Sequence, residues 1–395
     1  MPPPPKHYWF HISYWVYIIP IAYSIYFALM MVPLSGFFRP IVKTGVDRCN
    51  KVTGFDDFKN CEDFVLSDEP GVAYVGCDPI RSKVNTVLNF NSLAPGEIAP
   101  SGSIWKVRYT ENPPVVEKLI VENGELELSS DYHPLGLGFD VHPTTGQRTI
   151  FTVNLAHKNG PSIELFDVKD SKLVYKKSIK HPEIYSPNSI HIVSDIRLRA
   201  DDGTPSFFFS NDHYFSSGIL KMIENYFFYL SNVKFYNART VEVQKAVDGL
   251  LFANGVSGTD DTLFVAEVHK MDVKQYKINI KTTPHLHVSL DFVQEKVFEM
   301  GVDNVAYNPK TNQVVVAGHP KSLQTVNYIT AAEKEGVPLP PSQAAAWDLN
   351  TNEVKILFED DGSLFGSSTA AAIDAVNSKL LVSGLYEEGL LVCDI

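Results

Sequence analysis

The sequence predicts an all-β protein, a six-bladed β-propeller with an N-terminal hydrophobic anchor helix. Two observations predict the propeller. After about residue 40, short apolar strands alternate with turn residues, and 25 prolines and 24 glycines are spread through the 395 residues. A third observation, a long uncharged run near the N-terminus, predicts the helix. With 44% hydrophobic and 20% charged residues, the chain can bury a large core.

Residues 1–40 form a predicted membrane segment. No Asp, Glu, Lys or Arg occurs from His7 to Phe38. This run exceeds the apolar core of a cleaved signal peptide and is long enough to cross a bilayer. One end is rich in aromatic residues of the kind found at membrane interfaces, namely Tyr8, Trp9, Tyr14 and Trp15. The alternative is a buried helix of the globular domain, but such a helix should have a polar face.

Residues 41–395 form the predicted propeller. Four stretches, rich in Val, Ile, Phe and Thr, each place two strands around a turn: 138–154, 252–268, 302–319 and 344–360. Division of these 355 residues by six gives about 59 residues per blade. Repeated hairpins over one long domain indicate a propeller, with a pair of β-sandwiches as the alternative.

The segment 219–236 departs from this β pattern, because it combines clustered aromatic residues with helix formers. Two interpretations remain open. It is either a packed insertion helix or an exposed amphipathic lid that touches a membrane or covers a site.

Small polar residues stand at several of the apolar strand boundaries. Asn188 and Asn254 are 66 residues apart, and Asn254 and Asp303 are 49 apart, which is near one blade each. Equivalent positions on successive blades converge on the axis of a propeller, so these side chains are expected to meet there. The full set offers only oxygen ligands, which predicts Ca²⁺ rather than zinc: Glu62, Asn188, Asn254, Asp303 and Asn304. Each asparagine alone is more often a turn former.

From about Cys49 to the C-terminus the sequence resembles the paraoxonase/arylesterase family. The resemblance is carried by CEDF at 61–64, SPNSI at 186–190, SNDHYF at 210–215, FANG at 252–255 and VDN at 302–304. It implies a six-bladed propeller that hydrolyses lactones and aryl esters with calcium at its axis. It also implies an uncleaved hydrophobic N-terminus.

The resemblance implies that the catalytic calcium is held by the same five residues. It further implies a second calcium, bound by the Asp63 side chain and the Leu137 carbonyl. Ser189 stands where the family has an aspartate in that second site. Loss of a carboxylate there puts the second ion in question.

The largest departure from the family is catalytic, because Leu135 stands where the family has a general-base histidine. His133 lies two residues earlier, and His157 lies two residues beyond the position of the partner histidine. Both are candidate catalytic residues, although a surface-loop histidine is the alternative for His157. His213 and His319 are expected to lie in the wall of the site, or to pack structurally.

The resemblance, together with the oxygen ligands, implies a calcium-dependent hydrolase of carboxylic esters, aryl esters or lactones, that acts on a small hydrophobic substrate. The alternative is a non-catalytic propeller that is stabilised by calcium and acts as a binding module. The formal charge of −12 and pI of about 5.5 argue against nucleic-acid binding.

The four cysteines bear on the compartment. The resemblance implies a disulfide between Cys49 and Cys393, which persists only in an oxidising compartment. The propeller is therefore expected in the secretory lumen or outside the cell, anchored to the membrane. The charges that flank the apolar run weakly favour the opposite orientation, with Lys6 before it and three basic residues after it. Cys61 and Cys77 have no counterpart in the family, and we expect two buried thiols.

Overall fold

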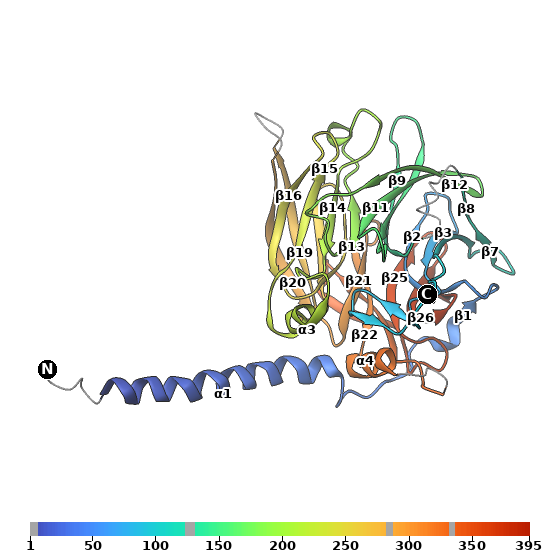
Figure 1. Ribbon diagram of the computed structural model, residues 1–395. Coiled ribbons are helices and arrows are strands. Elements are labelled where there is room, and N and C mark those ends of the chain that lie inside the picture. The colour runs from blue at the N-terminus through green and yellow to red at the C-terminus, as the bar shows by residue number, and fades with distance from the viewer. Residues whose placement is uncertain (1–6, 123–130, 282–286, 332–335) are drawn as a thin grey trace.

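The computed structural model describes residues 7–122, 131–281, 287–331 and 336–395. Antiparallel strands surround a central axis, and one long helix, α1 (His7–Ser35), extends away from them (Figure 1). Lys6, whose charge entered the predicted membrane orientation, lies outside the described residues. The boundary predicted at residue 40 stays a prediction.

In the described part of the chain the strands form the six predicted units, each with four antiparallel strands, and the second unit has a fifth strand at its edge. The first comprises β2 (Lys59–Leu66), β3 (Val72–Cys77), β6 (Ser103–Arg108) and β7 (Val115–Lys118). The second comprises β9 (Pro134–Val141), β10 (Arg148–Asn154), β11 (Ser162–Lys169) and β12 (Lys172–Ile179), with β8 (Ile120–Glu122) parallel to β12. The third comprises β13 (Pro187–Ile192), β14 (Phe207–Asn211), β15 (Ser231–Asn237) and β16 (Glu242–Leu250).

The fourth unit comprises β17 (Ala253–Gly258), β18 (Thr262–Glu267), β19 (Asp272–Lys281) and β20 (His287–Val297). The fifth comprises β21 (Gly301–Asn308), β22 (Gln313–His319), β23 (Ser342–Asp348) and β24 (Glu353–Asp360). The sixth comprises β25 (Ser368–Asp374), β26 (Lys379–Glu388), β27 (Leu390–Asp394) and β1 (Cys49–Val52). Shorter elements are β4 (Val84–Asn85), β5 (Phe90–Asn91), α3 (Gly218–Phe227), α4 (Ser322–Thr330), and the 3₁₀ turns Val46–Arg48 and Ile196–Leu198.

The first strand of each unit lies innermost. β2, β9, β13, β17, β21 and β25 each contact the next in turn, and β25 contacts β2, which closes the ring. Each of the four predicted hairpins matches an inner strand and its neighbour, or a pair further out in the same blade. The predicted six-bladed propeller is confirmed.

The last blade contains both ends of the propeller. β1 pairs antiparallel with β27, with Cys49 opposite Cys393, and these two cysteines form a disulfide. The predicted bond is therefore present. Because it joins residues 344 positions apart, it closes nearly the whole propeller into one covalent ring.

The core lies between adjacent blades. In one cluster Phe151 and Leu165 of the second blade pack with Phe207 and Phe209 of the third, and none of the four is exposed. Such burial contributes about 25 cal/mol per Å² of apolar surface. The same arrangement recurs between the other blades and fixes the inner strands around the axis.

The segment 219–236 is only partly helical, which corrects the expectation of a helix throughout. α3 ends at Phe227, and residues 231–237 form the buried strand β15. β15 is rich in Val, Phe and Tyr and lies between β14 and β16, so hydrogen bonding in the sheet overrides helix propensity there.

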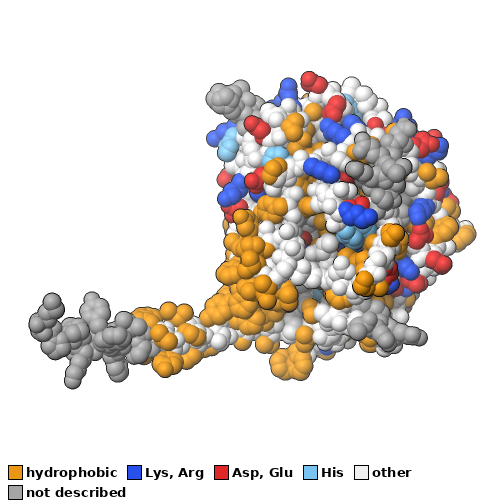
Figure 2. Space-filling model, viewed as in Figure 1, with side chains coloured by type: hydrophobic (Ala, Val, Ile, Leu, Met, Phe, Trp, Pro, Cys, Tyr) orange, Lys and Arg blue, Asp and Glu red, His pale blue; other side chains and the backbone are white. Residues whose placement is uncertain are grey.

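From Tyr14 onward, the surface of helix α1 is apolar and mostly exposed. Its stretch Tyr14–Ser35 is long and apolar enough to cross a membrane, and none of the most hydrophobic window is buried in the protein. The alternative of a buried helix is therefore not observed. The ring of Phe27 stacks on that of Phe227 in α3, with centroids 5.3 Å apart. Figure 2 shows apolar side chains continuing from α1 onto the body beside it.

Candidate metal centre and adjoining cavity

The five predicted metal ligands all lie on innermost strands at points where the strand register shifts. Glu62 lies in a shift of β2 against β3, and Asn188 in a shift of β13 against β14. Asn254 lies in a shift of β17, and Asp303 and Asn304 in one of β21. A β-bulge of this kind redirects a side chain out of the regular alternation. All five side chains are buried around the axis.

Two glycines allow the inner strands to approach closely at this level. A Cβ on Gly255 would lie 2.6 Å from Cα of Asn304, and a Cβ on Gly136 would lie 2.1 Å from the carbonyl oxygen of Asn188. Any larger residue would push the strands apart. Both glycines therefore help to set the width of the site.

Each predicted ligand has one buried oxygen with no hydrogen-bond partner among the described residues. The five atoms are Glu62 Oε2, Asn188 Oδ1, Asn254 Oδ1, Asp303 Oδ1 and Asn304 Oδ1. A buried, unsatisfied acceptor costs about 1–3 kcal/mol, so five of them around one axis require compensation. A hard cation with oxygen ligands would satisfy all five, and the donor set fits that requirement.

Electrostatics at the site also favours a cation. Burial raises the pKa of Glu62 well above its usual range, and the neighbouring Asp303 and Asp63 raise it further. Two carboxylates thus face one buried site together with three amide oxygens. A bound positive charge would relieve this repulsion.

Hydrogen bonds from neighbouring groups fix the orientation of the ligands. Nδ2 of Asn304 donates to Oε1 of Glu62 over 2.8 Å, which leaves Oδ1 of Asn304 and Oε2 of Glu62 free. Nδ2 of Asn188 donates to Oδ2 of Asp212 over 3.3 Å. His319 Nε2 lies 2.9 Å from Oδ2 of Asp303. His319 is therefore hydrogen-bonded to one of the candidate ligands, and its role in the site stays a prediction.

His213 contacts the candidate site indirectly, through Asp212. Its Nδ1 is 2.6 Å from Oδ1 of Asp212, and its Nε2 is 2.5 Å from Oδ1 of Asn225 in α3. It links α3 to Asp212, which in turn orients Asn188. His213 thus supports the site from behind.

At the predicted second calcium site, the carboxylate oxygens already have hydrogen-bond partners. Asp63 accepts hydrogen bonds of 2.8 Å from the backbone N–H groups of Phe64 and Leu137, one on each carboxylate oxygen. Ser189 Oγ accepts from the N–H of Val256. These contacts give Asp63 partners within the protein, and the second ion stays a prediction.

An apolar cavity of about 80 Å³ adjoins four of the ligands. Glu62, Asn188, Asn254 and Asp303 line it, together with His269 and His319. Most of its remaining wall is apolar and includes Val87, Leu88, Leu135, Phe252, Val268, Val326, Ile329 and Leu385. The arrangement suits a small, largely apolar molecule with one polar group directed at the axis.

His133 and His157 do not line this cavity. Their rings stack on each other with centroids 3.8 Å apart, and His133 Nδ1 lies 3.2 Å from Oδ2 of Asp78. Asp131, His133 and His157 offer ligand atoms within 4.8 Å of one another. Burial lowers the pKa of His157, and His133 lowers it further. Their predicted catalytic role stays a prediction, whereas Leu135 does face the cavity.

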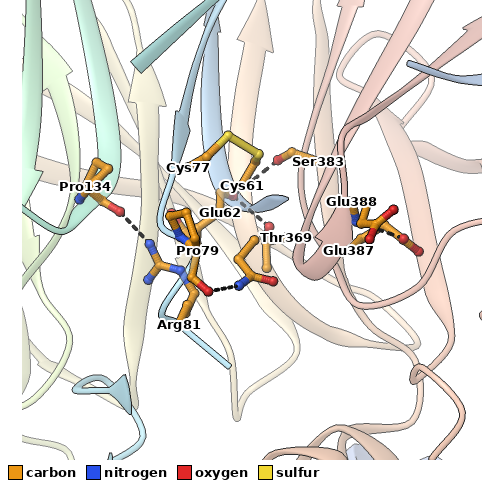
Figure 3. Close-up of a disulfide and its surroundings, with 11 residues drawn as sticks. Cys61, Glu62, Cys77, Pro79, Arg81, Pro134, Thr369, Ser383, Glu387 and Glu388 are labelled. Carbon is orange, nitrogen blue, oxygen red and sulfur yellow. Dashed lines mark hydrogen bonds between the residues drawn. A yellow bond between two sulfur atoms is a disulfide. The ribbon is translucent and has the colours of Figure 1, made fainter. Parts of the chain in front are cut away.

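Sequence reasoning missed Arg81 and Asp212. Arg81 lines the cavity, is 4% exposed, and donates from Nη2 to the carbonyl oxygen of Pro134 (Figure 3). Asp212 belongs to the SNDHYF motif, so its position beside His213 was a signal that could have identified it. No comparable motif marks Arg81.

Cys61 and Cys77 form a disulfide, which corrects the expectation of two buried thiols. They face each other across β2 and β3, directly before Glu62 and at the end of the strand that leads to Arg81 (Figure 3). All four cysteines are thus in disulfides. Thr369 Oγ1 donates to the carbonyl oxygen of Glu62 over 2.6 Å, which further fixes this stretch of β2.

Known proteins match most of the chain. The family model described as Arylesterase matches residues 84–395. Serum paraoxonase/arylesterase 1 of Rattus norvegicus is 26% identical over 79% of this chain and 82% of its own length. Serum paraoxonase/arylesterase 2 of Bos taurus is 28% identical over 76% and 78%. Serum paraoxonase/lactonase 3 of Oryctolagus cuniculus is 24% identical over 73% and 76%.

The chain also resembles solved structures at low sequence identity. A gluconolactonase of Xanthomonas campestris is 10% identical over 90% of this chain and 97% of its own, with a TM-score of 0.48. A likeness at this level carries no argument about function.

Proposed function

Since the chain belongs to the arylesterase family, a family of ester and lactone hydrolases, we propose that it is a calcium-dependent hydrolase of carboxylic esters, either aryl esters or lactones. One observation carries the proposal of calcium. Five buried oxygens without a partner among the described residues face one axis at the end of an apolar cavity. Carboxylate and amide oxygens in this number are typical of Ca²⁺.

Glu62, Asn188, Asn254, Asp303 and Asn304 would hold the ion. Bound there, calcium would supply positive charge that polarises an ester carbonyl and stabilises the oxyanion that forms from it. Asp212 and His319 keep Asn188 and Asp303 oriented toward the axis. The apolar wall around Leu135 and Phe252 would take the hydrophobic part of the substrate and exclude water.

The proposed site lacks the histidine that would be expected to activate water. Leu135 lines the cavity where the family has a histidine, so the proposed enzyme lacks a base at that point. A general base contributes typically 10²–10⁴-fold, and its loss slows hydrolysis without removing the contribution of the metal. The same observation favours the second candidate function, a calcium-stabilised binding module without turnover.

The experiment that separates the two is hydrolysis of a panel of lactones and aryl esters by the full chain. We expect activity that a chelator abolishes and added Ca²⁺ restores. Asn254→Ala should abolish it while the fold is retained, because one of the five oxygens is lost. Asn279→Ala, in β19 where the side chain bonds the exposed Asp291, is the matched control and should keep full activity. Calcium binding without hydrolysis of any member would favour the binding module.

We also propose that α1 anchors the protein in a membrane, with the propeller on the oxidising side. The exposed apolar stretch Tyr14–Ser35 and the two disulfides support this arrangement. Carbonate extraction tests it. The full chain should stay with the membrane fraction. In intact vesicles, a membrane-impermeant reductant added outside should not reach the disulfides, so a membrane-impermeant thiol reagent should not label the cysteines. Release of the full chain by carbonate would overturn the anchor.

A further inference from the structure

Arg81 is a buried cation in the wall of an otherwise apolar cavity. Its side chain is 4% exposed, and the cavity it lines also holds four of the candidate metal ligands. Fully buried arginines are rare unless they are paired with a carboxylate. The surroundings of this guanidinium therefore require an explanation.

The guanidinium has few partners among the described residues. Nη2 donates to the carbonyl oxygen of Pro134, and Nε is buried without any hydrogen-bond partner. No carboxylate oxygen of the described residues is in salt-bridge contact with Arg81, although several other arginines have such a contact. Asp78, which precedes it on the same loop, is engaged by His133 at 3.2 Å. The Nε–H donor therefore has no partner among the described residues and could be satisfied by a ligand.

The charges of the site also favour binding of an anion at Arg81. Arg81 lines the same cavity as the carboxylates of Glu62 and Asp303. A divalent cation held by Glu62 and Asp303 would neutralise both carboxylates. Arg81 would then have no carboxylate of the described residues at salt-bridge distance, and an anionic ligand could provide that partner.

We infer that Arg81 is an anion-binding residue of this cavity and that the ester or lactone substrate carries a carboxylate. The inference rests on the proposed function, because it names the class of substrate for that site. A guanidinium binds a carboxylate through a planar pair of N–H donors, which Lys cannot reproduce. The apolar residues Val87, Leu88 and Leu135 would then contact the carbon skeleton between the carboxylate and the reacting carbonyl.

A matched pair of lactones tests the inference. γ-Valerolactone and the lactone in which a carboxylate replaces its methyl group differ in charge with little change in shape. With Ca²⁺ present, we expect kcat/KM for the anionic lactone to exceed that for the neutral one by about 10- to 100-fold, since hydrogen bonds to charged groups contribute about 1.5–3 kcal/mol. Arg81→Met should abolish this preference and change the neutral substrate much less.

Two variants separate charge from structure. Arg81→Lys keeps a cation and a donor toward Pro134 and should retain only part of the preference. Lys83→Met is the control for removal of a cation from the same loop, because Lys83 is exposed and paired with Glu97. It should leave the ratio of the two substrates unchanged. An unchanged ratio in Arg81→Met, or a wild-type preference for the neutral lactone, would overturn the inference.

A binding measurement decides the case in which neither lactone is hydrolysed, which would count against the proposed function alone. Calorimetry on the calcium-loaded full chain would compare cyclopentanecarboxylate with cyclopentanecarboxamide, neither of which contains an ester. Binding of the carboxylate that falls at least tenfold in Arg81→Met supports the anion site. Equal binding by wild type and Arg81→Met would show that the carboxylate is held by the metal or not at all, and would refute it.

Discussion

Asn304 donates from Nδ2 to Oε1 of Glu62 over 2.8 Å, and this bond joins innermost strands of two blades through residues that are 242 positions apart in the chain. It lets an amide and a carboxylate lie side by side while each keeps one oxygen free. Replacement of the amide by a second carboxylate would remove the donor and place two buried negative charges in contact. The effect of this replacement on stability depends on whether a cation is bound.

Asn304→Asp is therefore expected to destabilise the calcium-free protein by about 1–3 kcal/mol, since a buried hydrogen bond is lost and a like charge is added. With Ca²⁺ the extra carboxylate becomes a ligand, so the variant should gain more stability from calcium than the wild type does. Thermal unfolding with chelator measures the loss of stability in the calcium-free protein, and unfolding with saturating Ca²⁺ measures the gain from calcium. A calcium-induced shift equal to that of the wild type would contradict the proposed site.

The oxygen chemistry of the site could be predicted from residue types and blade spacing, but its geometry could not. Glu62, Asn188 and Asn254 are redirected to the axis by register shifts in their strands. A shift of one residue leaves no mark in the hydrophobic pattern, because it depends on the partner strand. Arg81 was missed for a related reason: it lies in a loop, and only the fold brings it to the cavity.

Leu135→His tests whether this cavity is a hydrolase site that lacks its base. Leu135 lines the cavity beside the candidate metal ligands, so an imidazole there would face the position where water must be activated. We expect hydrolysis of lactones or aryl esters to rise by about 10- to 100-fold, a fraction of the full contribution of a general base. The pH profile should acquire a new limb near the pKa of a histidine.

Leu135→Gln is the matched control, because it adds a polar group of similar size that cannot act as a base near neutral pH. It should not raise the rate. An equal rate in the His and Gln variants, with both proteins folded and calcium-loaded, would remove the support for a base at this position.

The Cys61–Cys77 disulfide depends on the register in which β2 pairs with β3. β2 and β3 pair one-to-one from Leu66↔Ala73 to Asp63↔Gly76, and the register then shifts so that Cys61 faces Cys77. A regular hairpin would have placed Glu62 there instead. The expectation of two free thiols was wrong because the sequence does not show this shift. The same irregularity directs Glu62 to the axis.

The two disulfides should differ in their effect on stability. Chain-entropy estimates give about 6 kcal/mol for the bond that spans 344 residues and about 3 kcal/mol for the bond that spans 16, as upper bounds. Replacement of each pair by serines should therefore cost more for Cys49–Cys393 than for Cys61–Cys77. Equilibrium unfolding in guanidinium chloride with saturating Ca²⁺ gives both values, and the reverse order would contradict the loop-closure explanation.

His269 should make the protein sensitive to mild acid. Its pKa is lowered to about 4, mainly by burial and to a smaller extent by the nearby His213, while the hydrogen bond to the Asn225 carbonyl oxygen acts in the opposite direction. Because the folded state binds this proton less readily than the unfolded state, stability is fully present above about pH 6.5 and is lost as the pH falls toward 4. Between pH 7 and pH 5 the loss from this one group is about 2 kcal/mol.

His269→Gln removes the titration and should flatten the dependence of the free energy of unfolding on pH over this interval, even though it costs some stability at pH 7. His287→Gln, at an exposed position of β20, is the control and should leave the slope as in the wild type. Urea unfolding at several pH values between 5 and 7 measures the slopes. If His269→Gln and the wild type lose the same free energy on acidification, His269 is not the source of the acid sensitivity.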